Sequence, residues 1–382
     1  MAYRYYYKDY ELSDGLVYSA NLLAQSAVLN FTDVAAEDTL CGLGIGHAFN
    51  LNQNSIFGKG FNINVIERLT ADISLPAENK IYTYIDYFGN SYTEDFGYFK
   101  DFIRSEYEPN IIKSIPSYKA IDNLTGQERK NFRPIRWLVN DKIIKGFNLY
   151  GNLVFICDRN GNYYHIKGEN YDSEYGDCRP THIKQVPSDC TDYNEAKDIY
   201  RFEYNEDEML SKILDVDGKV LVLYVYEGDT LKSVKFKSGL AYSFEYMKGN
   251  VRQIETSNKF TISITPSGIS VMSSVDGVPS DNGVSTFNEI SSFTFDFSNN
   301  ITTVTKDKDN FEKFIFRDGK LSYYYLYENG RYIAAEKHTE ENKDVGNYKN
   351  ALIKTVYKAD RETLFGTVMG NITFGKGEYD RS

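Results

Sequence analysis

The stretch FEYNEDEMLSKILDVDGKVLVLYVYEGDTLKSVKFKSGLAYSFEYMKGNVRQI, from Phe202 to Ile254, decides the fold. One short pattern is written twice in it and then begun a third time, with starting tyrosines 22 and 20 residues apart. Copies at this spacing are typical of proteins built from small repeated units. We therefore expect a repeat architecture. The residues that define the pattern are Tyr204, Leu210, Ile213 and Gly218, then Tyr226, Leu231, Val234 and Gly239, then Tyr246.

Each copy predicts two strands joined by tight turns. The segments KVLVLYVY (219–226) and LAYSFEY (240–246) are rich in β-branched and aromatic residues, which suit a pleated and at least half-buried surface. Pairs such as Asp217-Gly218 tolerate positive φ and so close hairpins. A single hairpin is marginal in water. We therefore expect consecutive hairpins to stack edge to edge and to bury their aromatic faces.

Weaker copies of the same pattern lie on both sides of this stretch. They occupy residues 150–164, 297–316 and 318–333, so that the pattern extends over much of 147–335. Two interruptions, at roughly 168–200 and 258–290, separate the copies. Tandem copies are a more specific signal than any single copy, because one hairpin pattern is common in β proteins.

The order tyrosine, Leu-x-x-Ile/Val, Asp/Asn-Gly, tyrosine resembles the YD-repeat proteins of the Rhs and teneurin type. In that family, Tyr-Asp-rich hairpins wind into a broad β-sheet spiral. The chain departs from the family at the aspartate, because Asn205, Glu227 and Met247 follow the repeat tyrosines. The resemblance implies the shell of a surface or secreted protein, whose longer relatives enclose a toxin or display a binding head. Those relatives carry a self-cleaving, aspartate-containing motif, and we find no such motif between Thr363 and Ser382.

The N-terminal third carries a second resemblance. The segments GIGHAFN (44–50), FGKGFNIN (57–64) and IYTYIDYFGN (81–90) are similar to the β-rich leader that precedes YD repeats in large Gram-positive surface or secreted proteins. Phe61 stands where that leader usually has a tryptophan. Together the two resemblances cover most of residues 13–335 and imply a bacterial scaffold, encapsulation or adhesion protein.

Composition agrees with an aromatic, all-β chain and excludes two classes of partner. The 382 residues include 33 tyrosines and 24 phenylalanines, and 41% of all residues are hydrophobic, so the chain can bury a sizeable core. The formal net charge of −11 argues against nucleic acid, which requires a basic surface. No apolar run reaches the roughly 18 residues of a membrane-spanning helix. We therefore expect neither a nucleic-acid partner nor a membrane span.

The N-terminus and the cysteines leave the compartment open. The segment MAYRYYYKDY lacks the apolar core of a Sec signal peptide, whereas the family resemblance favours an extracellular, cell-surface or virion location. Cys41, Cys157, Cys178 and Cys190 show no C-x-x-C spacing, which argues against structural zinc. A disulfide between Cys178 and Cys190 and free or buried thiols are both compatible with this spacing.

Several short segments carry residues used in catalysis or metal binding, but none has the full pattern. The segment 177–182 gathers Asp, Cys and His, and we interpret it as an irregular loop or insertion. The segment 307–312 alternates acids but lacks the glycine and glutamate of a calcium loop, so a hairpin turn is expected. The glycines of 42–46 indicate close backbone packing or a β-bulge. We assign no catalytic residue, cofactor or metal ligand.

The excess of aromatic residues offers one functional alternative. Successive tyrosines along a strand point to opposite faces, so one face enters the core and the other can present rings to a ligand. Core packing is the simpler interpretation. The candidate exposed binding residues are Tyr163, Tyr164, Tyr323, Tyr324 and Tyr325.

We predict an all-β fold of stacked antiparallel β-hairpin repeats, forming an open β-sheet spiral or strip behind a β-rich leader domain. The predicted parts are the leader (1–100), a linker with short helices (101–140), the YD-like hairpin repeat block (141–335), and a charged loop with terminal strands (336–382). The loop or a short helix is expected at 336–350, and the last strands at 351–358 and 363–374. Too few hairpins are present to close a large shell, so we expect an open strip, a fragment or a subunit.

Three functions fit this prediction. The first is a non-enzymatic scaffold, whose strand edges pair with a protein partner or with another copy. The second is a carbohydrate-binding surface or phage tail component that uses exposed tyrosines. The third is a glycan-active enzyme on a β-solenoid, which requires two or three acidic or basic residues converging in a groove. The sequence specifies neither the ligand or cargo nor the export route.

Overall fold

The computed structural model of the chain forms two compact units, which we describe separately. The larger unit contains Asp9–Ser19 and Ala27–Asn258, and the smaller unit contains Met1–Lys8, Ala20–Ser26 and Lys259–Ser382. The residues described are 7–13, 15–22, 26–35, 43–55, 58–71, 82–93, 103–105, 121, 124–139, 143–157, 163–173, 177–186, 192–258, 260–265, 268–274, 287–298, 301–317, 320–345, 348–359 and 378–381. Both units are built from antiparallel strands, which confirms the all-β prediction.

Two small sheets are formed by the first third of the chain. The N-terminal sheet has the strand order β1-β2-β3-β4-β5, and the second sheet has the order β6-β7-β8. The strands of the first are β1 (Tyr7–Ser13), β2 (Leu16–Asn21), β3 (Ser26–Val34), β4 (Ile45–Ser55) and β5 (Gly58–Ile63), and those of the second are β6 (Arg68–Ala71), β7 (Tyr82–Ile85) and β8 (Ser91–Thr93).

A long ladder of antiparallel strands completes the larger unit, and each strand pairs with the next along the chain. Its strands are β9 (Ile103–Ser105), β10 (Arg136–Val139), β11 (Ile144–Phe147), β12 (Leu153–Cys157), β13 (Tyr163–Glu169), β14 (Arg179–Val186), β15 (Lys197–Tyr204), β16 (Leu210–Leu214), β17 (Val220–Glu227), β18 (Thr230–Phe236), β19 (Ala241–Met247) and β20 (Asn250–Thr256). One short helix, α3 (Gly126–Phe132), lies within the predicted linker, and a 3-10 turn, η4 (Tyr193–Glu195), precedes β15.

The smaller unit continues the same construction of consecutive hairpins. Its strands are β21 (Phe260–Thr265), β22 (Gly268–Ser274), β23 (Phe287–Ser298), β24 (Ile301–Asp307), β25 (Asn310–Arg317), β26 (Lys320–Glu328), β27 (Arg331–Val345), β28 (Tyr348–Ala359) and β29 (Glu378–Arg381).

The prediction of a charged loop or short helix at 336–350 was wrong. β27 continues through this segment to Val345 and pairs with β28 over most of its length. Charged side chains do not prevent a strand here, because the hydrogen bonds between paired strands are made by backbone groups. The strand expected at 351–358 is confirmed by β28, whereas the one expected at 363–374 lies outside the described residues. The predicted domain boundaries stay predictions.

The turns of the repeat use one recurring device. The Asn205 Oδ1 atom accepts hydrogen bonds from the backbone N–H of Asp207 (3.0 Å) and Met209 (2.9 Å), and Asp215 Oδ1 does the same one hairpin later for Asp217 and Lys219. An Asn or Asp side chain that bonds to backbone two residues ahead replaces part of the turn's own bonding. In these two turns, the Asn or Asp that precedes the turn is therefore as informative as a turn glycine.

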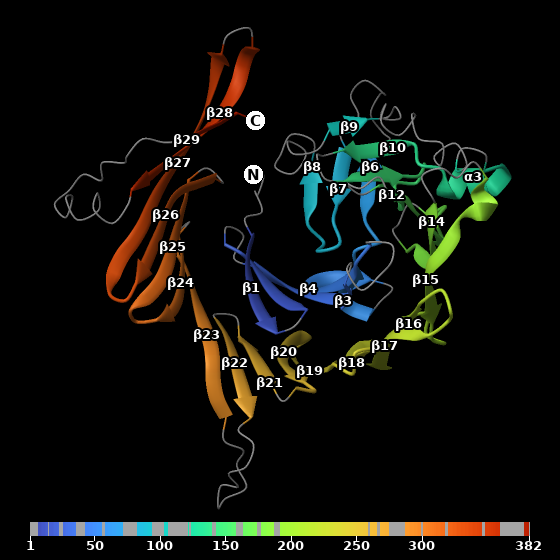
Figure 1. The fold of residues 1–382 in the computed structure, drawn as a ribbon, viewed down its shortest axis with the longest axis horizontal. Coiled ribbons are helices and arrows are strands. Elements are labelled where there is room, and N and C mark those ends of the chain that lie inside the picture. The colour runs from blue at the N-terminus through green and yellow to red at the C-terminus, as the bar shows by residue number, and fades with distance from the viewer. Residues whose placement is uncertain are drawn as a thin grey trace, which may run out of the picture. The chain divides into compact units, whose positions relative to one another are not determined.

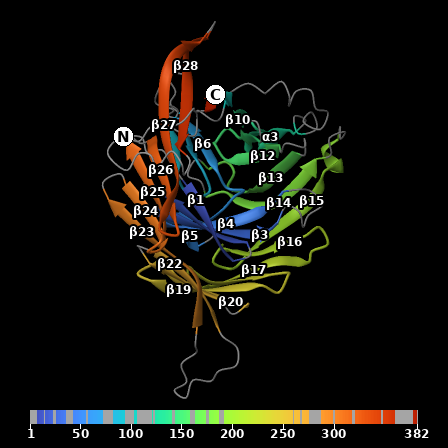
Figure 2. The same cartoon turned by 60° about the vertical axis from the view of Figure 1, so that its left-hand side comes forward.

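The repeat hairpins of β17 to β20 in the larger unit bury one face. Along β17 and β19, buried residues alternate with exposed ones, as expected for strands with one solvated face. Figures 1 and 2 both show β3 and β4 lying beside the strands β16 to β18 of the ladder. We call the side that faces the N-terminal sheet the inner face. The N-terminal sheet thus covers the side of the ladder on which the repeat places its apolar residues.

Candidate functional site

The repeat tyrosines occupy one structural position in successive hairpins. Each lies at a β-bulge just before a turn, where the pairing register shifts. Each hydroxyl donates a hydrogen bond back to a carbonyl of an earlier strand: Tyr204 to Pro180 (2.6 Å), Tyr226 to Leu210 (2.8 Å) and Tyr246 to Leu231 (2.6 Å). Burial raises the pKa of all three phenols, so they stay protonated and donate. The pattern therefore encodes a bond between hairpins as well as a strand.

The other pattern residues fall into two groups. The apolar members are buried, which agrees with a core role: Leu210, Ile213, Leu231 and Val234 are each at most 2% exposed. Gly218 and Gly239 adopt left-handed backbone with φ of +76° and +91°, and a Cβ added there meets open space. These glycines are needed because the backbone adopts positive φ, and not because a side chain would clash with a neighbour.

An aromatic interface joins the N-terminal sheet to the ladder. Phe31 of β3 contacts Phe244 of β19 with ring centroids 5.5 Å apart, and Phe61 of β5 contacts the same ring at 5.8 Å. Phe49 of β4 meets Tyr246 at 6.3 Å, mostly edge to face. Such tilted pairs add to the stabilisation from burial alone. We call the ring set of Phe31, His47, Phe49, Phe61, Tyr224, Tyr242, Phe244 and Tyr246 the aromatic interface.

A buried polar network lies within the aromatic interface. His47 Nδ1 lies 2.7 Å from Asp33 Oδ1 and 2.8 Å from Oδ2, and the Tyr224 hydroxyl donates to Asp33 Oδ2 at 2.6 Å. Because a carboxylate only accepts, His47 carries the shared proton on Nδ1. Burial raises the pKa of Tyr224 well above its usual range, and the adjacent Asp33 raises it further. The network thus joins β3 and β4 to β17 by buried hydrogen bonds.

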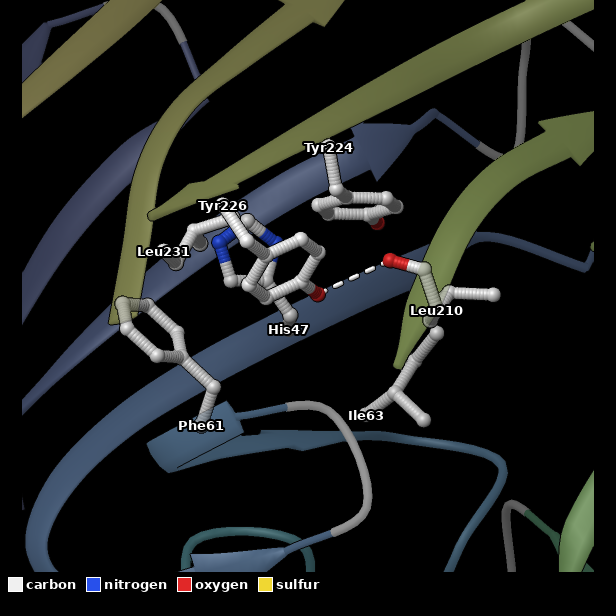
Figure 3. A pocket seen from close by; sticks show the side chains of 7 residues that line it. All are labelled: His47, Phe61, Ile63, Leu210, Tyr224, Tyr226 and Leu231. Atoms are coloured by element: carbon white, nitrogen blue, oxygen red, sulfur yellow. Dashed lines mark hydrogen bonds between the residues drawn. The ribbon is translucent and has the colours of Figure 1, made fainter. Parts of the chain in front are cut away.

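His47 also lines a small cavity at this interface (Figure 3). Its second ring nitrogen, Nε2, is buried and has no hydrogen-bond partner among the described residues. A carboxylate-oriented histidine is the arrangement that activates nucleophiles in enzymes. The cavity volume is only about 10 Å³, roughly the space of one water molecule. The remaining lining residues are Phe61, Ile63, Leu210, Tyr224, Tyr226 and Leu231.

A second buried cluster fixes the β6-β7-β8 sheet to β11. Lys145 Nζ lies 2.5 Å from Glu67 Oε2, and both groups bond to the Tyr84 hydroxyl, at 3.0 and 2.7 Å. Asp86 accepts hydrogen bonds from Asn90 and Tyr92. Burial raises the pKa of Asp86 to about 6, with a smaller contribution from the Glu67 charge, while the hydrogen bonds oppose the rise. Sequence inspection missed this cluster because its members lie 78 positions apart.

The histidines and cysteines that the sequence offered as weak candidates are held in the structure as follows. Burial lowers the pKa of His165 to about 3, and its two nitrogens bond to Tyr193 and the Phe132 carbonyl, so it is a neutral core residue. Cys178 is a free, buried thiol whose pKa burial raises to about 12, which disfavours the reactive thiolate. Cys41 and Cys190 lie outside the described residues.

The segments compared with functional loops are structural in the described part of the chain. Arg179 begins β14, so residues 179–182 are strand and the interpretation of all of 177–182 as an irregular loop was wrong. Asp307–Asn310 forms the expected hairpin turn. A Cβ at Gly46 would lie 2.6 Å from the Phe31 carbonyl oxygen, which confirms close backbone packing. No group of three or more potential metal ligands occurs among the residues described.

The candidate exposed tyrosines divide between the two units. Tyr163 and Tyr164 are 1% and 0% exposed, so the prediction of exposure was wrong for them. β13 pairs with β12 and β14 and is buried on both faces at these positions, a situation that the doubled tyrosine does not reveal. Tyr323, Tyr324 and Tyr325 lie on β26 and are each partly exposed. Their ligand-binding role stays a prediction.

Comparisons with known proteins add little to the site. No family model and no curated protein match the chain. Among solved structures, it is similar to TcdB2-TccC3 (TM-score 0.27, 9% identity, 94% of this chain and 22% of that one) and to TcdB2-TccC3-Cdc42 (TM-score 0.27, 11% identity, 90% and 20%). The chain spans about a fifth of the length of these structures. Among the described residues, no helix is long and apolar enough to cross a membrane.

Proposed function

We propose that the chain is a non-enzymatic structural module, a wall of β-hairpin repeats fixed to its own N-terminal sheet, that serves as the scaffold of a larger surface or secreted assembly. The observation that carries the proposal is the repeated bond from a pattern tyrosine to an earlier strand, combined with the aromatic interface on the inner face. Both devices fix strands to one another, and both recur along the repeat.

The polar groups support the same proposal. The hydroxyl and carboxylate oxygens of the Asp33–His47–Tyr224 network bond to one another, and the Glu67–Tyr84–Lys145 cluster is likewise bonded internally. Apart from His47 Nε2, these groups have hydrogen-bond partners, and buried hydrogen-bonded polar groups specify one arrangement of the elements they join. A stable, uniquely arranged wall is what a scaffold requires.

Three substitutions in the buried polar groups distinguish a scaffold from an enzyme. Asp33→Asn, His47→Gln and Glu67→Gln are assayed for stability by chemical denaturation and for turnover on a panel of glycan, ester and peptide substrates. We expect each variant to unfold at lower denaturant, with no turnover by the parent protein. Turnover by the parent that disappears in His47→Gln or Glu67→Gln while the fold is retained would overturn the proposal.

Assembly through strand edges belongs to the same proposal, because an unpaired strand end is a template for another strand. Sedimentation of the parent protein over a range of concentrations measures it. We expect association that increases with concentration. If the protein is monomeric at all concentrations, it does not self-assemble, and its strand edges would pair only with a different protein.

A further inference from the structure

One sheet face of the smaller unit carries a row of aromatic rings that its own core does not use. β25, β26 and β27 pair in register, with Phe311 opposite Tyr327 and Tyr327 opposite Tyr332. Tyr323 and Tyr325 stand on the same side of β26 as Tyr327, because side chains alternate along a strand. We call Phe311, Tyr323, Tyr325, Tyr327 and Tyr332 the outer aromatic face.

The rings of the outer aromatic face form a continuous set. Phe311 and Tyr327 are stacked with centroids 4.6 Å apart, and Tyr332 meets Tyr327 edge to face at 5.0 Å and Tyr325 at 6.2 Å. Tyr325 and Tyr323 are nearly parallel, with 9° between their planes and 6.4 Å between centroids. Tyr332 is 46% exposed and the other four are half-buried. The row is thus ordered by its own contacts while its surface stays open.

The opposite face of the same strands already has its partners. Phe314 and Phe316 are each 3% exposed, and Thr302 of β24 donates to the Leu22 carbonyl. Lys8 forms an ion pair with Glu312, and the Tyr324 hydroxyl donates to the same carboxylate at 2.6 Å. The core of these hairpins therefore lies on the side of Phe314 and Tyr324, and the outer aromatic face lies on the other.

Other hairpins of the chain show what a solvated face ordinarily carries. On β15 to β19 of the larger unit, the residues facing away from the core are the ion pair of Glu203 and Lys212 and other charged residues, mixed with aliphatic ones such as Leu223 and Val225 and with no aromatic ring. A polar face is the norm for an antiparallel sheet exposed on one side. Contiguous exposed aromatic residues mark interaction sites.

Positive charge accompanies the rings. The register places Lys313 opposite Tyr325 and Lys337 opposite Tyr323, on the same face, and the Arg317 guanidinium lies 5.3 Å from the centre of the Tyr323 ring. Glu312 and Glu336 lie opposite Leu326 and Tyr324, on the core side. Among the residues whose side chains are described, Asp296 on β23 is the acidic residue that the register places on the outer side nearest to Lys313, two strands away. In a chain of net charge −11, this is a local cationic strip.

We propose that the outer aromatic face binds an acidic polysaccharide, with sugar rings stacked on the tyrosines and carboxylates paired with Lys313, Arg317 and Lys337. Tyrosine combines an apolar ring with a polar hydroxyl and so meets both the C–H face and the hydroxyl groups of a sugar. Charge-assisted pairs with carboxylate add direction, and an arginine held over an aromatic ring presents a planar fork. A nucleic acid would also stack, but it needs a far larger basic surface than three cations in an acidic protein.

The test is calorimetric titration of the full chain with three acidic oligosaccharides, namely oligogalacturonate, hyaluronan and sialyllactose, with uncharged maltohexaose and single-stranded oligothymidylate alongside. We expect binding to at least one acidic saccharide that is weaker for maltohexaose and weakens as salt rises. Tyr332→Ser and Arg317→Glu should each reduce affinity about tenfold, which corresponds to about 1.4 kcal/mol. Lys212→Ala, on the outer face of the larger unit, is the matched control and should bind as the parent does.

Three outcomes overturn the proposal: no acidic saccharide binds, binding is unchanged in both variants, or oligothymidylate binds in preference to every saccharide. Because Tyr332 and Arg317 are exposed, both variants should fold, and circular dichroism with thermal unfolding verifies this. Arg317→Lys provides a second variant, which should retain part of the affinity because it keeps the charge but loses the planar fork. The scaffold proposal does not depend on this result, since it makes no claim about the outer face.

Discussion

The hairpins of β17 to β20 and those of β24 to β27 share a construction but differ on their outer sides. Both bury an apolar face, exemplified by Val234 at 0% exposure in the first set and Phe314 at 3% in the second. In the first set the outer side mixes charged residues such as Lys235 and Glu245 with the aliphatic Val225, whereas in the second it carries aromatic rings such as Tyr325. The repeat pattern therefore specifies the hairpin and its inner face and leaves the outer face free to vary.

The inner faces also differ in what they contact. In the larger unit the rings of Phe31 and Phe61 pack directly on Phe244, within a closed cluster of aromatic residues. Among the described residues of the smaller unit, the contacts with the core side include single side chains and carbonyls, such as Lys8 with Glu312 and Leu22 with Thr302. The larger unit should consequently depend on packing far more than the smaller one, and substitutions can test this.

Removing a ring from the aromatic interface should have the largest effect. Phe61 is 1% exposed and contacts His47, Phe49 and Phe244, so Phe61→Ala creates a cavity as well as losing burial. We expect a loss of about 3–5 kcal/mol in the free energy of unfolding of the larger unit. Hydrogen exchange of peptides from 220–256 measures it.

The matched substitution in the smaller unit is Phe311→Ala, which removes the same ring from the outer aromatic face. It should cost about 1 kcal/mol or less, because that ring is already half solvated. Equal losses from the two substitutions would contradict the distinction between a packed interface and an open face.

The stability of the two units should also depend differently on pH. The pKa of Asp86 is about 6 in the folded protein and 3.8 in the reference state, so the folded state binds the proton more tightly. The stability that protonated Asp86 contributes is fully present below pH 3.8 and is lost as pH rises through about 6. The difference between the two pKa values corresponds to about 3 kcal/mol of unfolding free energy at most. Asp86→Asn should remove this dependence and make the larger unit relatively more stable at pH 7.

Denaturation of the parent and of Asp86→Asn at pH 4.5 and pH 7 measures the effect, and the difference between the two proteins isolates Asp86 from the other carboxylates. Hydrogen exchange of peptides from 301–335 provides the comparison with the smaller unit, where the substitution should change nothing. Identical pH dependence in the two proteins would contradict the prediction.

Deleting one hydroxyl should test the bond that the repeat encodes. Tyr226→Phe leaves the Leu210 carbonyl without its 2.8 Å donor in a partly buried position. The expected cost is about 1 kcal/mol, seen as faster hydrogen exchange in β16 and β17. Tyr327→Phe in the smaller unit is the control, because water can reach a half-exposed hydroxyl, and it should change stability by a few tenths of a kcal/mol. A larger loss of stability in Tyr327→Phe would mean that a tyrosine hydroxyl makes a comparable hydrogen bond in the smaller unit.

Sequence reasoning succeeds here where the information is local. The β-branched and aromatic residues of 219–226 and the Asp217-Gly218 turn predict the strand and the turn before it, and both are found. Leu231 and Val234, two apolar members of the pattern, are buried as expected. Local propensity and turn chemistry agree at these positions.

The candidate site required information that is distant in sequence. His47, Asp33 and Tyr224 meet across about 190 positions, and nothing near any of them marks the encounter. The prediction that Tyr163 and Tyr164 are exposed was wrong for a related reason, since Tyr163-Tyr164 and Tyr323-Tyr324 are the same dipeptide in the sequence. Only the strands and elements on either side decide that the first pair is buried and that the second is divided between a core face and an outer face.

The smallest expected difference between the two units concerns the turns, which they share. Gly218 in the larger unit and Gly330 in the smaller have φ of +76° and +73°, and a Cβ at either would meet open space. Gly218→Ala and Gly330→Ala should therefore each cost about 1 kcal/mol through backbone strain alone, with no contribution from packing. Local hydrogen exchange of the two turns measures each cost. The turn is the same in both units, whereas the sheet faces differ. Equal losses of stability in the two glycine variants, together with unequal losses in Phe61→Ala and Phe311→Ala, would therefore show that the units differ in their faces. Unequal costs at the two glycines would instead mean that the hairpins themselves differ.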